Sequence, residues 1–113
     1  MSFLKRKKES PAASHRETAG PDHPETVPID AVVPRVRVAV SGKVTRMTMR
    51  PTSGQPALAV CVSDETGTVT AVWTGRREIG GVTLGRRMVI EGVPMRRGPN
   101  VEFTNPVYTL LPR

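Results

Sequence analysis

The segment RVRVAVSGKVTRM, residues 35–47, decides the fold that we predict for this chain. Valine at positions 36, 38, 40 and 44 alternates with Arg, Ser, Lys and Thr. This period of two is typical of a strand that buries one face. Gly42 interrupts the apolar parity, as expected where a strand bends sharply or bulges. We therefore predict a long, bent first strand that two halves of a barrel share.

Four further segments toward the C-terminus have strand patterns: residues 57–64, 68–75, 86–97 and 101–111. The sequence DETG, from Asp64 to Gly67, predicts a tight turn between the second and third strands. Four glycines within residues 75–85 disfavour a helix, so we expect a loop there with at most a helical turn. Pro106 cannot donate a ladder hydrogen bond, which predicts an edge or an interruption in the last strand. The expected fold class is all-β, with five strands in a small barrel.

Charge divides the chain into two parts. Residues 1–30 hold five basic and five acidic side chains, together with four prolines and few apolar residues, and we expect them to form a disordered tail. The whole net charge of +7 therefore falls on residues 31–113, which we expect to be the folded domain. Lys43 is the only lysine in that domain, and the other basic residues are arginines, which grip phosphate in a bidentate fork and stack on bases.

The order of the strand patterns resembles the OB-fold of the anticodon-binding type, found in synthetases, in a replicative polymerase subunit and in a branch-migrating helicase. The resemblance rests on VSGKV at residues 40–44, SDETGTVTAVW at 63–73 and GRRMVIEGVPMRRGPNVEF at 85–103. With WTGRREIGGVTLGRR at 73–87 and NPVYTL at 105–110, the chain is similar to a family of small stand-alone OB-fold nucleic-acid-binding proteins of actinobacteria. The resemblance covers residues 35–111 and implies nucleic-acid binding. Strands two and three of such domains usually present aromatic residues, and Trp73 is the only one here.

The binding surface of an OB-fold lies over strands two and three and the loops that flank them. In this sequence the small residues Thr and Ala occupy those strands, and the basic residues flank them. We expect these residues to grip phosphates from the rim of the barrel. Trp73 could stack on a base. It could equally pack in the core, because it shares parity with Val69 and Ala71. The predicted nucleic-acid-binding residues are Lys43, Arg46, Arg50, Trp73, Arg76, Arg77, Arg86, Arg87, Arg96 and Arg97.

The sequence offers little for catalysis. His15 and His23 fall in the tail, and the single cysteine, Cys61, sits between valines in a strand, where a packed structural residue is expected. The chain has no nucleophile elbow, P-loop or dinucleotide fingerprint. We therefore expect no catalytic residues, no metal, no cofactor and no enzymatic activity. Neither a membrane-spanning apolar run nor a secretory signal is present, so a cytoplasmic location is expected.

These observations favour weak binding of single-stranded DNA with little sequence preference, and RNA remains an alternative because no composition signal separates the two. A second hypothesis is an interaction module that docks on a DNA-processing enzyme, since an open strand edge can accept another chain. A third has the KRKK cluster at residues 5–8 contacting nucleic acid or an anionic membrane.

Overall fold

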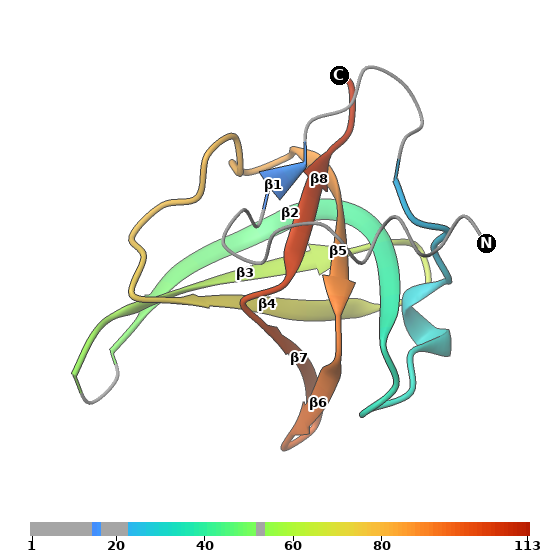
Figure 1. Ribbon diagram of the computed structural model, residues 1–113, viewed down its shortest axis with the longest axis horizontal. Coiled ribbons are helices and arrows are strands. Elements are labelled where there is room, and N and C mark those ends of the chain that lie inside the picture. The colour runs from blue at the N-terminus through green and yellow to red at the C-terminus, as the bar shows by residue number, and fades with distance from the viewer. Residues whose placement is uncertain (1–14, 17–22, 52–53) are drawn as a thin grey trace.

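A computed structural model of the protein describes residues 15–16, 23–51 and 54–113. The fold is all-β, as the sequence predicts, with a single turn of 3-10 helix, η1 (Ile29–Ala31), among the described residues. No helix in the described part of the chain is long and apolar enough to cross a membrane. The strands are β1 (His15–Arg16), β2 (Val38–Arg50), β3 (Ala57–Ser63), β4 (Thr68–Thr74), β5 (Arg87–Gly92), β6 (Pro94–Arg97), β7 (Asn100–Thr104) and β8 (Val107–Leu110) (Figure 1).

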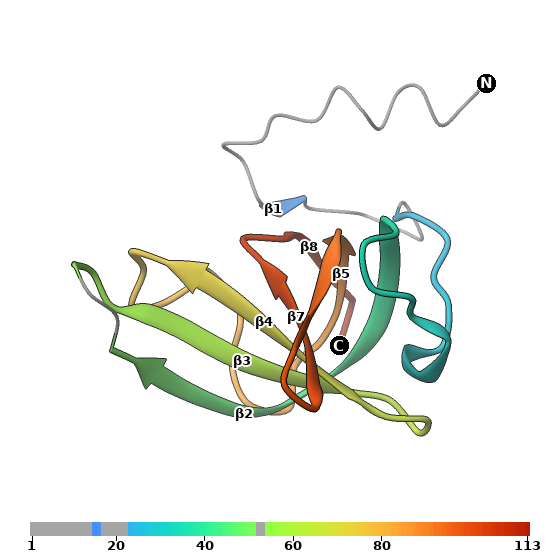
Figure 2. The ribbon, with the colours of Figure 1, turned by 90° about the horizontal axis from the view of Figure 1, so that it is seen from below.

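The long strand β2 belongs to both halves of the sheet. Its residues 38–43 pair with β5, and its residues 43–50 pair with β3, both antiparallel. Figure 2 shows β2 curving strongly along its length. A Cβ atom on Gly42 would lie 2.6 Å from the carbonyl oxygen of Ser63, so only glycine lets the two strands approach this closely. The predicted long, bent first strand is therefore confirmed.

The expected barrel of five closed strands is not confirmed. The strands follow the order β1-β8-β5-β2-β3-β4-β7-β6, and the ladder of the described residues is open, with β1 and β6 at its two edges. The fourth expected strand divides at Val93 into β5 and β6, and the fifth divides before Pro106 into β7 and β8. Pro106 has no N–H to donate, and Asn105 has a φ of +49°, which ends β7. The last strand is thus interrupted where the sequence predicts.

Both divided strands still connect distant parts of the sheet. Strand β7 pairs parallel with β4, and strand β8 pairs antiparallel with β5. The C-terminal segment therefore contacts both halves of the sheet. Side chains of alternating parity fill the curled interior, and the largest fully buried ones are Trp73, Phe103, Met88 and Ile90. The connection between β4 and β5 contains no helix, as expected, and it inserts Ile79 and Val82 into this core.

The folded part of the chain begins before the predicted boundary at residue 31. Ile29 is 5% exposed and belongs to the core, and the backbone N–H of Val27 donates to the carbonyl of Ala39 at 3.0 Å. The N–H of Ile29 also donates to Oδ2 of Asp64 at 2.9 Å. One buried isoleucine and these two hydrogen bonds do not change the composition of the segment enough to mark it as folded. The predicted boundary was therefore placed too late in the chain. The predicted tail otherwise lies mostly outside the described residues, including the KRKK cluster at residues 5–8.

Candidate nucleic-acid interface

Three basic residues of β2 lie on the outer face of the sheet. Residues that are direct partners in neighbouring strands point to the same face. Lys43 is opposite Ser63, Arg46 is opposite Cys61 and Arg50 is opposite Ala57, all on the side of β3 away from the core. We call this surface the basic face and define it by its cationic residues, which are Lys43, Arg46, Arg50, Arg87 and Arg97.

A β-bulge in β2 brings these cations onto one face. The register with β3 moves from Val44–Val62 to Arg46–Cys61, so Thr45 is the extra residue. In an uninterrupted strand, Lys43 and Arg46 would point to opposite faces, because side chains alternate with a period of two. The hydroxyl of Thr45 donates to the carbonyl of Cys61 at 3.4 Å, which ties the bulge to β3. The bulge therefore aligns Lys43 with Arg46 and Arg50.

Each end of the basic face has one more arginine. Arg87 of β5 is the direct partner of Lys43, so the two cationic side chains project side by side. At the other end, Glu102 of β7 is the partner of Thr70 of β4, and its carboxylate draws Arg97 of β6 onto the same surface. Five of the nine predicted basic residues are therefore brought together.

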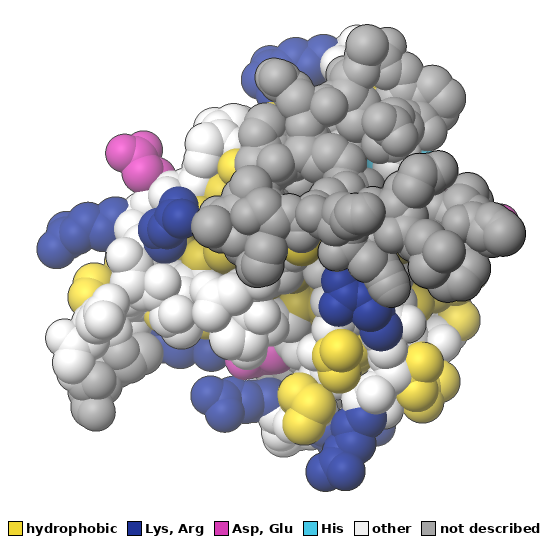
Figure 3. Space-filling model, viewed as in Figure 1, with side chains coloured by type: hydrophobic (Ala, Val, Ile, Leu, Met, Phe, Trp, Pro, Cys, Tyr) yellow, Lys and Arg dark blue, Asp and Glu magenta, His cyan; other side chains and the backbone are white. Residues whose placement is uncertain are grey.

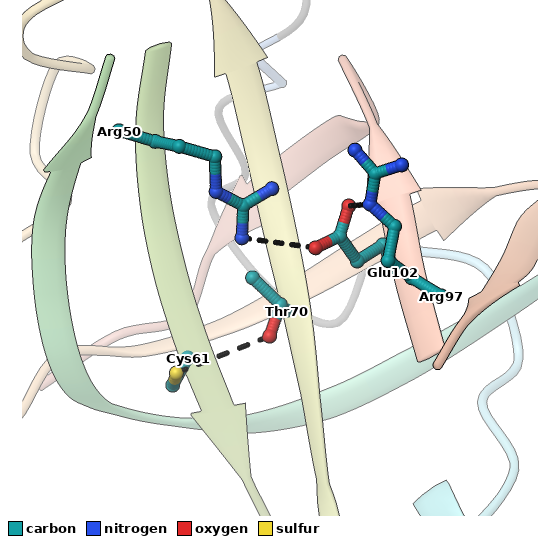
Figure 4. A network of polar contacts seen from close by, with 5 residues as sticks. All are labelled: Arg50, Cys61, Thr70, Arg97 and Glu102. Carbon is teal, nitrogen blue, oxygen red and sulfur yellow. Dashed lines mark hydrogen bonds and ion pairs between the residues drawn. The ribbon is translucent and has the colours of Figure 1, made fainter. Parts of the chain in front are cut away.

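Glu102 forms the centre of an ionic network on this face (Figure 4). Its Oε2 lies 2.9 Å from Nη2 of Arg50, and its Oε1 lies 3.4 Å from Nε of Arg97. Arg50 starts on β2 and reaches over β3 and β4 to meet the carboxylate on β7. Glu102 is only 8% exposed, so its carboxylate lies buried between these two partners. The network holds both guanidinium groups above the sheet.

Small side chains form the floor between the cations. Ala57, Ala59 and Val72 make a minor cluster that is separate from the main core. Beside them, Sγ of Cys61 lies 4.0 Å from Oγ1 of Thr70, and Cys61 is only half-buried. Ala57, Ala59 and Val72 are at most 5% exposed, so the surface between the cations is formed by the side chains that lie above this small cluster.

A groove of about 770 Å³ lies at the Lys43 end of the basic face. Lys43, Thr45 and Arg87 line one part of it, and residues 26–28 and the hairpin turn at 63–66 line the rest. The predicted tight turn is confirmed, since the N–H of Asp64 donates to the carbonyl of Gly67 at 3.0 Å. The groove therefore places two cations, Lys43 and Arg87, beside one sheltered hollow.

Asp64, at the edge of this groove, has a structural role as a hydrogen-bond acceptor. Partial burial raises the pKa of its carboxyl, but hydrogen bonds from the Thr66 hydroxyl and from the backbone N–H groups of Ile29, Thr66 and Gly67 outweigh burial. The net pKa therefore lies below the usual value of 3.8. The ionised carboxylate fastens the segment before β2 to the β3–β4 hairpin.

The other predicted site residues lie elsewhere. Arg96 is the partner of Val101, so its side chain points to the side opposite Glu102 and Arg97. Arg76 and Arg77 are exposed in the β4–β5 connection, where the charge of Arg76 acts on the core residue Tyr108. Arg86 donates through Nη2 to the carbonyl of Leu111 at 3.2 Å, beside a smaller cleft of about 290 Å³. None of these four is placed on the basic face by strand register.

Trp73 is a core residue and presents no ring face for a base. It is 2% exposed, its Nε1 donates to the carbonyl of Pro106 at 3.2 Å, and its ring meets Tyr108 edge-on at 5.7 Å. Burial raises the pKa of Tyr108 above 10.0, and the charge of Arg76 lowers it by less. Phe103 is also fully buried. Trp73, Phe103 and Tyr108 therefore all pack in the core.

Sequence reasoning missed Glu102 as a member of the site. A signal was present, because Glu102 lies between Val101 and Phe103 in a strand, and a charged residue in such a place is seldom buried without a partner. Which cations would meet it depends on the pairing of β7 with β4, and no local pattern shows that pairing.

Comparison with known proteins does not assign the chain. No family model matches it, and no curated protein matches it. Within the described residues, no group of three or more His, Cys, Asp or Glu side chains is placed to hold a metal ion.

Proposed function

We propose that this protein binds single-stranded nucleic acid, with DNA as the leading substrate, through the basic face. The observation that carries the proposal is the alignment of Lys43, Arg46 and Arg50 along one strand, with Arg87 and Arg97 at the two ends. Cations in a row follow the phosphates of an extended strand. The absence of exposed aromatic rings from the described residues makes the contact electrostatic and tolerant of sequence.

We also propose that the sheet is an OB-fold whose fourth and fifth strands are each divided. Three features support this assignment: β2 is shared by β3 and β5, β4 and β7 are parallel, and β5 and β8 are antiparallel. The basic face lies over β3 and β4, where OB-folds bind oligonucleotides. The family resemblance of residues 35–111 agrees with both proposals.

A titration of the full chain with a fluorescently labelled single-stranded oligonucleotide tests the function. If about four cations meet phosphates, the salt slope is about −3, and affinity falls about 50-fold between 50 and 200 mM salt. Duplex DNA and single-stranded RNA of the same length are the comparison ligands. Binding that does not depend on salt, or no binding at 50 mM salt, would contradict the proposal.

Paired variants locate the interface. The double substitution Arg46→Gln and Arg50→Gln should reduce the salt slope by about 1.4, because each lost phosphate contact removes about 0.7. The matched control is Arg76→Gln with Arg77→Gln, which removes the same charge from the β4–β5 connection. Equal losses from both pairs would show that net charge, and not the basic face, accounts for the binding.

A further inference from the structure

The edge strand β6 lies beside a group of exposed apolar side chains. The N–H of Arg35 donates to the carbonyl of Pro94 at 2.7 Å, which joins the turn before β2 to the first residue of β6. Val33, Val36, Val93 and Met95 flank this bond in sequence and are 56%, 54%, 46% and 45% exposed. We call these four residues the β6 patch. Figure 3 shows hydrophobic side chains beside Lys and Arg side chains in this part of the molecule.

The outer edge of β6 has one backbone position open for pairing among the described residues. β6 pairs with β7 on one side and ends the sheet on the other. The carbonyl of Pro94 points to the outer edge, since it accepts from Arg35. The two backbone polar groups of a strand residue point to the same side, and the side alternates along the strand. Arg96 therefore presents its N–H and its carbonyl to the outer edge.

The charge around the patch is positive. Arg35, Arg96 and Arg97 are exposed next to it, and the nearby carboxylates Glu91 and Glu102 are engaged by arginines at 3.6 Å and 2.9 Å. Like charges on an edge strand oppose pairing with a second copy of the same edge. The same charges attract an acidic chain. Charge complementarity therefore selects an acidic occupant over a second copy of this protein.

We propose that the β6 edge docks an extended acidic peptide in which acidic and apolar residues alternate. A strand added beside Arg96 continues the alternation of the sheet. Its acidic side chains would then lie on the same side as the Arg96 side chain, and its apolar side chains would lie beside Val93 and Met95. Within the described part of the chain, Arg96 is the one residue of β6 whose backbone groups are open for pairing, so affinity depends mainly on the apolar contacts and on the charge. This inference goes beyond the proposed nucleic-acid binding and does not depend on it.

The test measures fluorescence anisotropy of a labelled ten-residue peptide of alternating Glu and Val, added to the full chain without nucleic acid. We expect saturable binding, with backbone amide NMR shifts largest at Met95, Arg96 and Arg97. A peptide of the same composition without the alternation should bind at least fivefold more weakly. A Lys-Val alternating peptide should not bind. Equal binding of the alternating and rearranged peptides would overturn the proposal.

A matched pair of variants places the peptide on the patch. Met95→Glu should weaken binding at least tenfold, because it replaces an apolar contact with the peptide's apolar side chains by a carboxylate and adds negative charge beside an acidic ligand. Met49→Glu is the control, since Met49 is also a strand methionine and is also 45% exposed, but lies on β2 outside the patch. It should leave binding within about twofold of the parent value. Equal effects of the two variants, or a dimer of the unliganded protein that Met95→Glu dissolves, would refute the acidic-peptide site.

Discussion

Replacing Glu102 with Gln should strengthen nucleic-acid binding, although no new cation is added. The Glu102 carboxylate holds Arg50 at 2.9 Å and Arg97 at 3.4 Å, and it places a negative charge in the middle of the basic face. A phosphate bound to the far side of either guanidinium group would lie about 7 Å from this carboxylate. Coulomb repulsion at that distance is about 0.6 kcal/mol in water and about 2.4 kcal/mol at an effective dielectric constant of 20.

These two energies correspond to a gain in affinity of about threefold and about 50-fold, and we expect a value near tenfold. The salt slope should stay within about 0.7 of the parent value, because Arg50 and Arg97 already meet phosphates from their far sides and the substitution removes only the repulsion. The assay is the oligonucleotide titration at 50 and 200 mM salt. The substitution should also lower the free energy of unfolding by about 1 kcal/mol, since two partly exposed ion pairs are lost.

Glu91→Gln is the matched control for Glu102→Gln. Glu91 lies on β5 and forms an ion pair with Arg37 at 3.6 Å. Its substitution removes the same charge and also one ion pair, but at a place away from the centre of the basic face. It should change affinity less than twofold. If Glu102→Gln weakens binding, or if both variants strengthen it equally, the ionic network is not part of the interface and the reasoning fails.

Three further predictions concern Gly42, Asp64 and Cys61. Gly42→Ala should lower the free energy of unfolding by about 2–4 kcal/mol, measured by the fluorescence of Trp73, because the new methyl group would lie 2.6 Å from a backbone oxygen; an unchanged stability would mean that β2 and β3 separate easily. Asp64→Asn should lower Tm at pH 7, and the difference in Tm from the parent protein should shrink as the pH falls below 3.8. A carboxyl whose pKa is lowered by folding stabilises the fold above its unfolded pKa and loses that effect when it is protonated. The same difference in Tm at pH 7 and at pH 2.5 would count against this. Cys61, the single cysteine, should be alkylated more slowly when a single-stranded oligonucleotide covers the floor of the basic face, and an unchanged rate under saturating oligonucleotide would place the nucleic acid elsewhere.

Much of the strand architecture was predictable, because period-two patterns and glycine or proline positions are local signals. The alternation in residues 35–47 predicted β2, and Gly42 predicted that this strand bends or bulges; the bulge lies three residues later, at Thr45, and Gly42 instead permits the close approach of β3. Pro106 predicted the break between β7 and β8. The open ladder was not predictable, since it depends on how two divided strands pair with partners far away in the sequence.

The sequence predicted which kind of residue forms the candidate site, but it did not predict which of these residues share a surface. An excess of arginine over residues 31–113 indicated a polyanion partner without showing which arginines share a face. Arg76 and Arg77 could not be separated from Arg46 and Arg50 by sequence, because all four lie near the ends of the strands that the sequence predicts. The parity of Trp73 left core and surface equally open, and the hydrogen bond to Pro106 favours the core.

The sequence by itself determined an all-β chain with a basic folded part, because alternation of side chains and net charge are properties of the chain at short range. The tertiary structure alone decided which charges act together. One extra residue in β2, Thr45, reverses the parity of every side chain after it and puts Arg46 and Arg50 on the face of Lys43. The pairing of β7 with β4 then sets Glu102 between Arg50 and Arg97, and both effects arise from strand register, which only the folded sheet defines.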